Sequence, residues 1–277
     1  MTSTGLKCLA LALMLFDHIG EFIPGAPLWL RWIGRLSAPL FFYCAAVAFR
    51  HTSNRRKYLL RLYVSGVVMA ILNFVLNNYY ASHDGVAAAY ITNNIFVTIF
   101  LFCVVVWIVE TLQTDPKHGW LAFGAFAAFQ LLTTVLSMQS ETLLSNTIGA
   151  PRFIGAVLPN LIYNEGGVLW IFLGVALYFC QRPKSRLAAV YGGYCAVLFA
   201  LTLISAISLS GGISIADGGL FSVGQYLTRY DFQWMMIGAL PFMLLDNGQK
   251  GPGLKWLFYI FYPAHIIALF LIGNIFF

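Results

Sequence analysis

Four ionisable side chains stand inside apolar stretches of this sequence, where they could do chemistry. Asp17 and His18 are adjacent in LALALMLFDHIGEF, Arg35 follows in GRLSAPLFF, and His265 lies in FYIFYPAHIIAL. An ionisable group in a bilayer core costs a few kcal/mol, so such groups are usually retained for function. Because a neutral imidazole can accept a proton from an attacking amine or hydroxyl, His18 is a candidate general base, and His265 is a second candidate catalytic residue.

Each of these residues also has a simpler structural interpretation. His18 could be a packing histidine that bonds a neighbouring helix, Arg35 could extend to the interface, and His265 could belong to a helix kinked by Pro263. On a helix Asp17 points roughly 100° away from His18, so we expect it to face Arg35 or another helix.

The elements that carry these residues are membrane helices. The chain has 277 residues, 60% hydrophobic and 9% charged, with a mean hydropathy of +0.80, whereas soluble domains carry about 25% charged residues. The sequence therefore predicts an all-α integral membrane protein with one domain, 1–277. Its net charge of +6 lies in short loops, as topology requires, which argues against a nucleic-acid partner.

A membrane span needs about 20 mostly apolar residues, and this criterion predicts about nine transmembrane helices. They are roughly 6–23, 32–50, 58–78, 92–112, 119–138, 166–181, 187–209, 226–246 and 256–275. Between them, 139–165 contains Pro151 and Pro159, which favour a short re-entrant or interfacial piece over a full span.

The Lys and Arg residues predict a cytoplasmic N-terminus. With that orientation all of the 16 lie on the inner side except Arg31, Arg35, Arg152 and Arg229. His18, eleven residues after Lys7, and His265, ten after Lys255, would then both lie about 15 Å deep, which predicts one shared site near the midplane.

Further polar residues fall on the predicted outer half of the membrane. Arg35 and Asp231 each lie 15 residues from an inner helix end, about 22 Å away, with Arg229 nearby and Glu165 at the outer mouth of its helix. The expected polar layer therefore runs from the midplane to the outer face.

Two basic inner loops could bind the phosphates of a cytosolic cofactor. One supplies Arg55, Arg56, Lys57 and Arg61, and the other, DNGQKGPGLK, supplies Lys250 and Lys255 with glycines that allow close backbone approach. The first run could equally be a topology anchor. The five cysteines form no CxxC pair, so we expect no metal and no disulfide framework.

Taken together, six motifs resemble the TraX family, the F-pilin N-acetyltransferases, within the wider class of multi-pass membrane acyltransferases. They are KxxALxLMLxDHI from Lys7, GRLxxPLF from Gly34, KYLLRL from Lys57, NNIF from Asn93, NGxKG from Asn247 and FYxFYPxH from Phe258. Two positions depart from the family pattern, Asp246 and the NEGG at 164–167.

The resemblance implies transfer of an acetyl group from cytosolic acetyl-CoA to an amine, such as a pilin N-terminus, in a bacterial inner membrane. His18, His265 and Arg35 match the family's site motifs, with His18 as the general base and Asp17 beside it. Asn94 and Tyr262, which lie within the quoted motifs, are further candidates. The sequence is compatible with two mechanisms of transfer, direct attack of the amine on acetyl-CoA and formation of a covalent acyl-enzyme.

Two alternatives remain from the sequence. An acetyltransferase of an envelope sugar or lipid would use the same chemistry on another acceptor. A proton-coupled transporter would use Asp17, His18 and Asp231 as a relay, although the sequence contains no internal repeat of the kind that transporters have.

Overall fold

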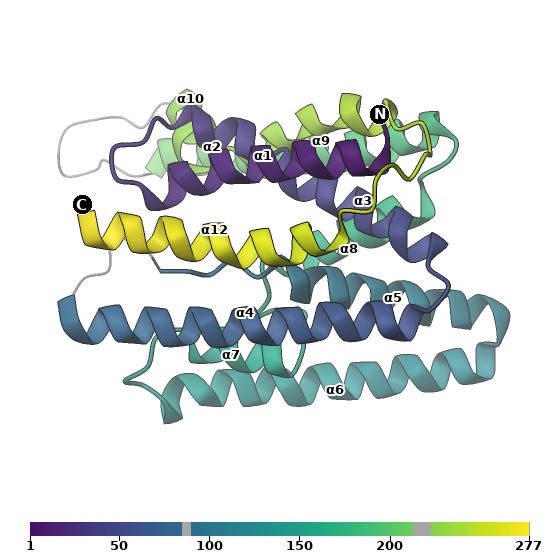
Figure 1. Cartoon of the computed structure of the whole chain (residues 1–277), viewed down its shortest axis with the longest axis horizontal. Coiled ribbons are helices and arrows are strands. Elements are labelled where there is room, and N and C mark those ends of the chain that lie inside the picture. The colour runs from purple at the N-terminus through teal and green to yellow at the C-terminus, as the bar shows by residue number, and fades with distance from the viewer. Residues whose placement is uncertain (85–89, 213–222, 277) are drawn as a thin grey trace. The chain divides into compact units, whose positions relative to one another are not determined.

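The computed structural model describes residues 1–84, 90–212 and 223–276, and within them every regular element is a helix (Figure 1). The chain divides into two compact units. Unit 1 comprises 1–41 with 180–253, and unit 2 comprises 42–179 with 254–277. Both are discontinuous in sequence, and the single membrane domain expected above stays a prediction.

Unit 1 holds the two N-terminal helices and a second group of helices from the later part of the chain. Its elements are α1 (Ser3–Phe22), α2 (Trp29–Gly34), the start of α3 (Ser37–His51), α9 (Lys184–Gly212), α10 (Val223–Gln225), the π-helix η1 (Tyr226–Tyr230), the 3-10 helix η2 (Gln233–Ala239) and α11 (Leu240–Leu244). α1 packs against α2, and α9 contacts α10, η1, η2 and α11. The Thr2 hydroxyl caps α1 by accepting from Gly5 N at 3.2 Å.

Unit 2 is a second set of packed helices. Its elements are the rest of α3, α4 (Arg55–Asp84), α5 (Ile95–Thr114), α6 (Pro116–Leu143), α7 (Ala150–Val157), α8 (Gly167–Phe179) and α12 (Lys255–Phe276). α5 packs against α4, α6 and α8, and α7 packs against α4 and α6.

Asp115 joins α5 to α6. It accepts from His118 N at 3.3 Å and lies 2.6 Å from His118 Nδ1, and Pro116 follows it at the start of α6. The side-chain hydrogen bond from His118 lowers the pKa of the Asp115 carboxyl below its usual value.

In the described residues, six helical stretches, with α2 and α3 counted as one, are long and apolar enough to cross a membrane, which makes this a multi-pass membrane protein. They are Trp29–His51, Arg55–Tyr80, Ile95–Thr114, Pro116–Leu143, Lys184–Ser208 and Trp256–Phe276. α6 shows the lipid-facing pattern most clearly, since Trp120, Leu121, Leu131 and Leu143 are all strongly exposed along it.

The nine predicted ranges all contain helix, but three of them fall outside these six spans. α1 carries Lys7, Asp17 and Glu21, which lower its mean hydropathy. α8 has 13 residues and is therefore about 20 Å long. The predicted helix 226–246 is divided into the shorter helices η1, η2 and α11. Nine spans and a cytoplasmic N-terminus therefore stay predictions.

Prolines account for the breaks that a hydropathy pattern does not detect. The predicted helix 32–50 is two helices, because Pro39 has no N–H to bond the Arg35 carbonyl and instead lies in the first turn of α3. Pro241 similarly begins α11. In 139–165 the structure has the end of α6 and the eight-residue α7, which is too short to span a bilayer.

Candidate functional site

Close packing of α1 on α2 creates the first candidate site, in unit 1. A Cβ on Gly34 would lie 2.3 Å from Asp17 Cβ and 2.6 Å from Asp17 Cα, and one on Gly20 would lie 2.9 Å from Arg31 Cγ. Because only glycine fits at these positions, the two backbones approach closely enough for the charged side chains of one helix to reach those of the other.

Two arginines of α2 and its C-terminal cap pair with two carboxylates of α1. Arg35 Nη2 lies 2.5 Å from both oxygens of Asp17. Arg31 Nη1 lies 2.7 Å from Glu21 Oε2 and 3.5 Å from Asp17 Oδ1. Since the four side chains are mostly buried and their charges cancel, no isolated charge is left in an apolar setting.

His18 lies beside this ion-pair cluster of Asp17, Glu21, Arg31 and Arg35. The residue is 4% exposed, and its Nε2 lies 4.0 Å from Glu21 Oε2. The sequence interpretation missed Glu21, although its spacing of four residues from Asp17 and three from His18 places it beside both on the helix.

The same three residues are a group that could hold a metal ion, since Asp17, His18 and Glu21 offer ligand atoms within 4.8 Å of one another. Both carboxylates already bind guanidinium groups, which would repel a cation. The donor set therefore suits a metal poorly, and the expectation of no metal stays a prediction.

Arg35 also connects the cluster to the segment after η1. Its Nη1 lies 3.3 Å from Gln233 Oε1, and its guanidinium lies 5.5 Å from the centre of the Phe232 ring. Gln233 N donates to Asp231 Oδ1 at 3.2 Å, and the Thr202 hydroxyl donates to Asp231 Oδ2 at 2.9 Å. Asp231 thus reaches Arg35 through Gln233, whereas Arg229 is exposed on η1.

His265 belongs to unit 2. Its Nδ1 lies 2.6 Å from the Phe261 carbonyl oxygen, and its ring stacks on the Phe261 ring at 4.8 Å. Because a carbonyl can only accept, Nδ1 carries the proton and the basic lone pair of the neutral imidazole is on Nε2. His18 and His265 lie in different units, so their expected shared site stays a prediction.

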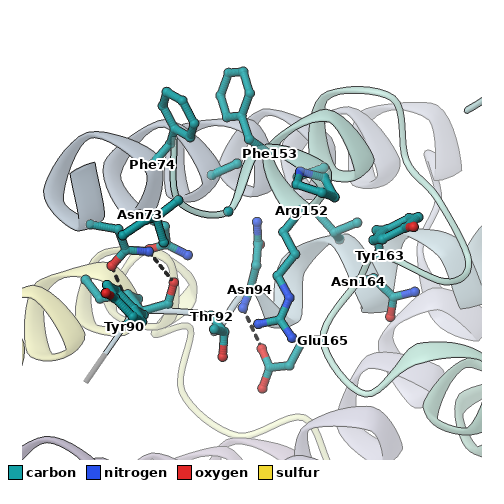
Figure 2. Close-up of a pocket in the computed structure, with 18 of the residues that line it drawn as sticks. Asn73, Phe74, Tyr90, Thr92, Asn94, Arg152, Phe153, Tyr163, Asn164 and Glu165 are labelled. Atoms are coloured by element: carbon teal, nitrogen blue, oxygen red, sulfur yellow. Dashed lines mark hydrogen bonds between the residues drawn. The ribbon is translucent and has the colours of Figure 1, made fainter. Parts of the chain in front are cut away.

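Asn94, Glu165 and Tyr262, which are far apart in sequence, meet at the N-terminus of α5, and Figure 2 shows the first two. Glu165 Oε2 accepts from Asn94 N at 2.6 Å and lies 3.2 Å from the Tyr262 hydroxyl, which accepts from Ile95 N at 3.0 Å. A carboxylate is stabilised at a helix N-terminus, so Glu165 has a clear structural role as a cap. The sequence singled out all three residues and could not show that they meet.

The basic run at the start of α4 is split between internal and exposed side chains. Arg55 Nη1 pairs with Glu110 Oε2, and its Nη2 lies 3.2 Å from the Tyr178 hydroxyl, which donates to Glu110 Oε1 at 2.5 Å. Arg56 and Lys57 are exposed and available to a phosphate. Arg61 is half-buried, and its Nε has no hydrogen-bond partner within the described residues.

The glycine-rich loop with Lys250 packs on the N-terminus of the chain. Ser3 N donates to Gln249 O at 2.8 Å, and the Thr4 hydroxyl lies 2.8 Å from the carbonyl oxygens of Lys250 and Pro252. Gly251 has φ 71°, and a Cβ there would lie 2.8 Å from Thr2 Oγ1. The backbone at Gly251 therefore packs closely against the N-terminal residues of the protein itself. Lys250 is exposed, and the side chain of Lys255 lies outside the described residues.

Comparisons with known proteins agree with the resemblance seen in the motifs. The chain is similar to the "Probable fimbrial assembly protein FimC, serogroup H1" of Dichelobacter nodosus, with 23% identity over 275 residues that cover 95% of this chain and 92% of the relative. No solved structure matches the chain. The family model described as "TraX protein" matches residues 3–273, and the chain therefore belongs to the TraX family.

Proposed function

We propose that this protein is a membrane acetyltransferase that moves an acetyl group from acetyl-CoA to the amino terminus of a pilin-like protein. The family match over residues 3–273 supports the proposal, because the motifs resemble those of F-pilin N-acetyltransferases. The name of the Dichelobacter relative, a probable fimbrial assembly protein, also agrees with a substrate in a pilus.

The observation that carries the proposal is the position of His18, buried in α1 with Nε2 4.0 Å from the Glu21 carboxylate. The acceptor amino terminus first releases its ammonium proton to solvent. The free amine then attacks the thioester carbon, and His18 takes the second proton that the nitrogen loses. The carbon–sulfur bond then breaks, CoA leaves as the thiolate, and the imidazolium returns its proton to that sulfur.

Asp17 and Arg35 act as positioning residues in this mechanism. Their ion pair, with Gly34 against Asp17, holds α1 on α2 and thereby fixes His18. Asp17 is already neutralised by Arg35 and does not serve as the base. His265, with Nε2 as its basic atom, would place the acetyl group, and the exposed Arg56, Lys57 and Lys250 would bind the phosphates of CoA.

The test is mass spectrometry of purified protein incubated with isotope-labelled acetyl-CoA and an envelope extract from piliated bacteria. The proposal predicts label on the α-amino group of a pilin-derived peptide. Label on a glycan or a lipid would overturn the acceptor and keep the enzyme class, whereas an unlabelled extract would overturn acetyl transfer.

A further inference from the structure

Unit 2 contains a cavity of about 520 Å³ beside the N-terminus of α5 (Figure 2). Its wall is formed by α4, α7 and the two segments that lead into α5 and α8, with Asn73, Asn94, Arg152 and Glu165 among the polar residues. This volume falls in the range of small-ligand sites, which typically enclose about 300–1,000 Å³. Nothing in the proposed chemistry so far uses it.

Two residues of the wall have hydrogen-bond acceptors without donors. Asn73 Nδ2 donates to Asn93 O and Asn94 Nδ2 donates to Gly66 O, both at 2.9 Å. Because a carbonyl only accepts, these bonds fix the orientation of each amide and leave Oδ1 as the other atom. Both Oδ1 atoms are buried and have no partner in the described part of the chain. Unpaired buried acceptors at a cavity wall favour a ligand that brings hydrogen-bond donors.

The charges of the cavity favour a cation. Glu165 and Glu141 contribute two carboxylates, and Arg152 contributes one guanidinium. Glu141 and Arg152 are exposed, whereas Glu165 is half-buried at the α5 N-terminus. The Arg152 side chain reaches toward Asn94 and Glu165 in Figure 2. The charged side chains of the wall therefore carry one more negative than positive charge, and its unpaired polar atoms are hydrogen-bond acceptors.

We propose that this cavity is the acceptor subsite and binds the terminal ammonium group and first amide N–H groups of a peptide. The inference rests on the proposed function and assigns the substrate class to a place in unit 2. A peptide amino terminus supplies one cation followed closely by neutral donors, which matches the carboxylates and the two Asn oxygens. A phosphoethanolamine headgroup would instead bring a phosphate close to Glu141 and Glu165.

A binding experiment without acetyl-CoA tests the subsite separately from catalysis. The probes are the peptide amide Ala-Ala-Ser-Ala-Ala with a free amino terminus and the same peptide N-acetylated, titrated calorimetrically into the detergent-solubilised protein. Losing the charge-assisted hydrogen bonds should weaken binding about tenfold or more in the acetylated peptide.

Glu141→Gln should weaken binding of the free peptide and leave binding of the acetylated one nearly unchanged. Asn73→Leu should weaken binding of both peptides, because the acetylated peptide keeps the amide N–H groups that Asn73 Oδ1 would accept from. Glu141 is exposed and its side chain makes no hydrogen bond within the described residues, so its variant tests the site even if Asn73→Leu fails to fold. Asp115→Asn is the matched control, because it removes an exposed carboxylate of unit 2 while Asn still caps α6.

Equal affinity for the two peptides, or variants that bind like the Asp115→Asn control, would overturn the subsite. Tighter binding of glycerophosphoethanolamine or glucosamine than of the free peptide would overturn the choice of a peptide. If Glu141→Gln and Asn73→Leu both acetylate the peptide with the wild-type KM, the proposed function stands and the subsite is overturned. A protein that binds the amine and transfers no acetyl group keeps the subsite and loses the proposed function.

Discussion

Gly34 on α2 lies so close to Asp17 on α1 that a Cβ at position 34 would be 2.3 Å from Asp17 Cβ. This contact is what lets Arg35, the next residue, place its guanidinium 2.5 Å from both Asp17 oxygens. The packing of two backbones and the ion pair are therefore one feature, and a methyl group at position 34 would disturb both.

We expect Gly34→Ala to lower the unfolding temperature and the transferase activity together, because α1 and α2 must separate to admit the methyl group. Gly192→Ala is the matched control in unit 1. It lies within α9 with no atom near the added Cβ, and replacing a helical glycine should stabilise by about 0.5–1 kcal/mol. Equal unfolding temperatures for the two variants would show that the α1–α2 contact is loose.

The Asp17–Arg35 pair should behave as one unit in a double-mutant cycle. Asp17→Ala or Arg35→Ala leaves an unpaired charge and should destabilise by about 3–5 kcal/mol, whereas the double variant should cost clearly less than the sum. Thermal unfolding in detergent measures all three. Additive losses would mean that the two side chains are not coupled.

The basic run of α4 should separate into two classes. Arg55→Ala and Glu110→Gln should both lower the unfolding temperature with little effect on CoA affinity, because these residues pair with each other. Arg56→Ala and Lys57→Ala should leave stability unchanged and raise the Kd for CoA, since both side chains are exposed. Calorimetry with CoA on the four variants distinguishes the two classes. Unchanged CoA affinity for Arg56→Ala and Lys57→Ala would mean that the basic run serves only to orient the protein in the membrane.

Cysteine labelling can decide whether α8 crosses the membrane. Between Asn54 and Gly212 lie four of the six clear spans, and α8 would be a fifth. With Asn54 in the cytoplasm, the predicted topology places Gly212 outside, so Asn54→Cys and Gly212→Cys should react from opposite sides. Cys8 is the exposed native cysteine and must be replaced first. Labelling from one side would mean that α8 does not span.

Hydropathy predicted where the helices lie, and it could not predict how they are interrupted. The helix break before α3 depends on the missing N–H of Pro39, which a windowed average does not register. The lengths of α8 and of the pieces in 226–246 likewise depend on local bonding, such as the Asp231 carboxylate accepting from Gln233 N.

The candidate residues were easier to predict than their partners. Charge and position within an apolar helix pointed to Asp17, His18 and Arg35, and helical spacing could have added Glu21. Pairs formed between distant helices, such as Arg55 with Glu110 or Glu165 with Asn94, leave no signal in residue spacing. Such pairs arise only when the helices pack.

The account depends most directly on His18 as the base. The decisive measurement is the initial rate of acetyl transfer from labelled acetyl-CoA to a pilin amino terminus, compared between the wild-type protein and folded His18→Ala. We predict a loss of about 10²–10⁴-fold with unchanged CoA affinity, as expected when a general base is removed. A His18→Ala protein that unfolds like the wild type and retains most of its rate would contradict the catalytic assignment.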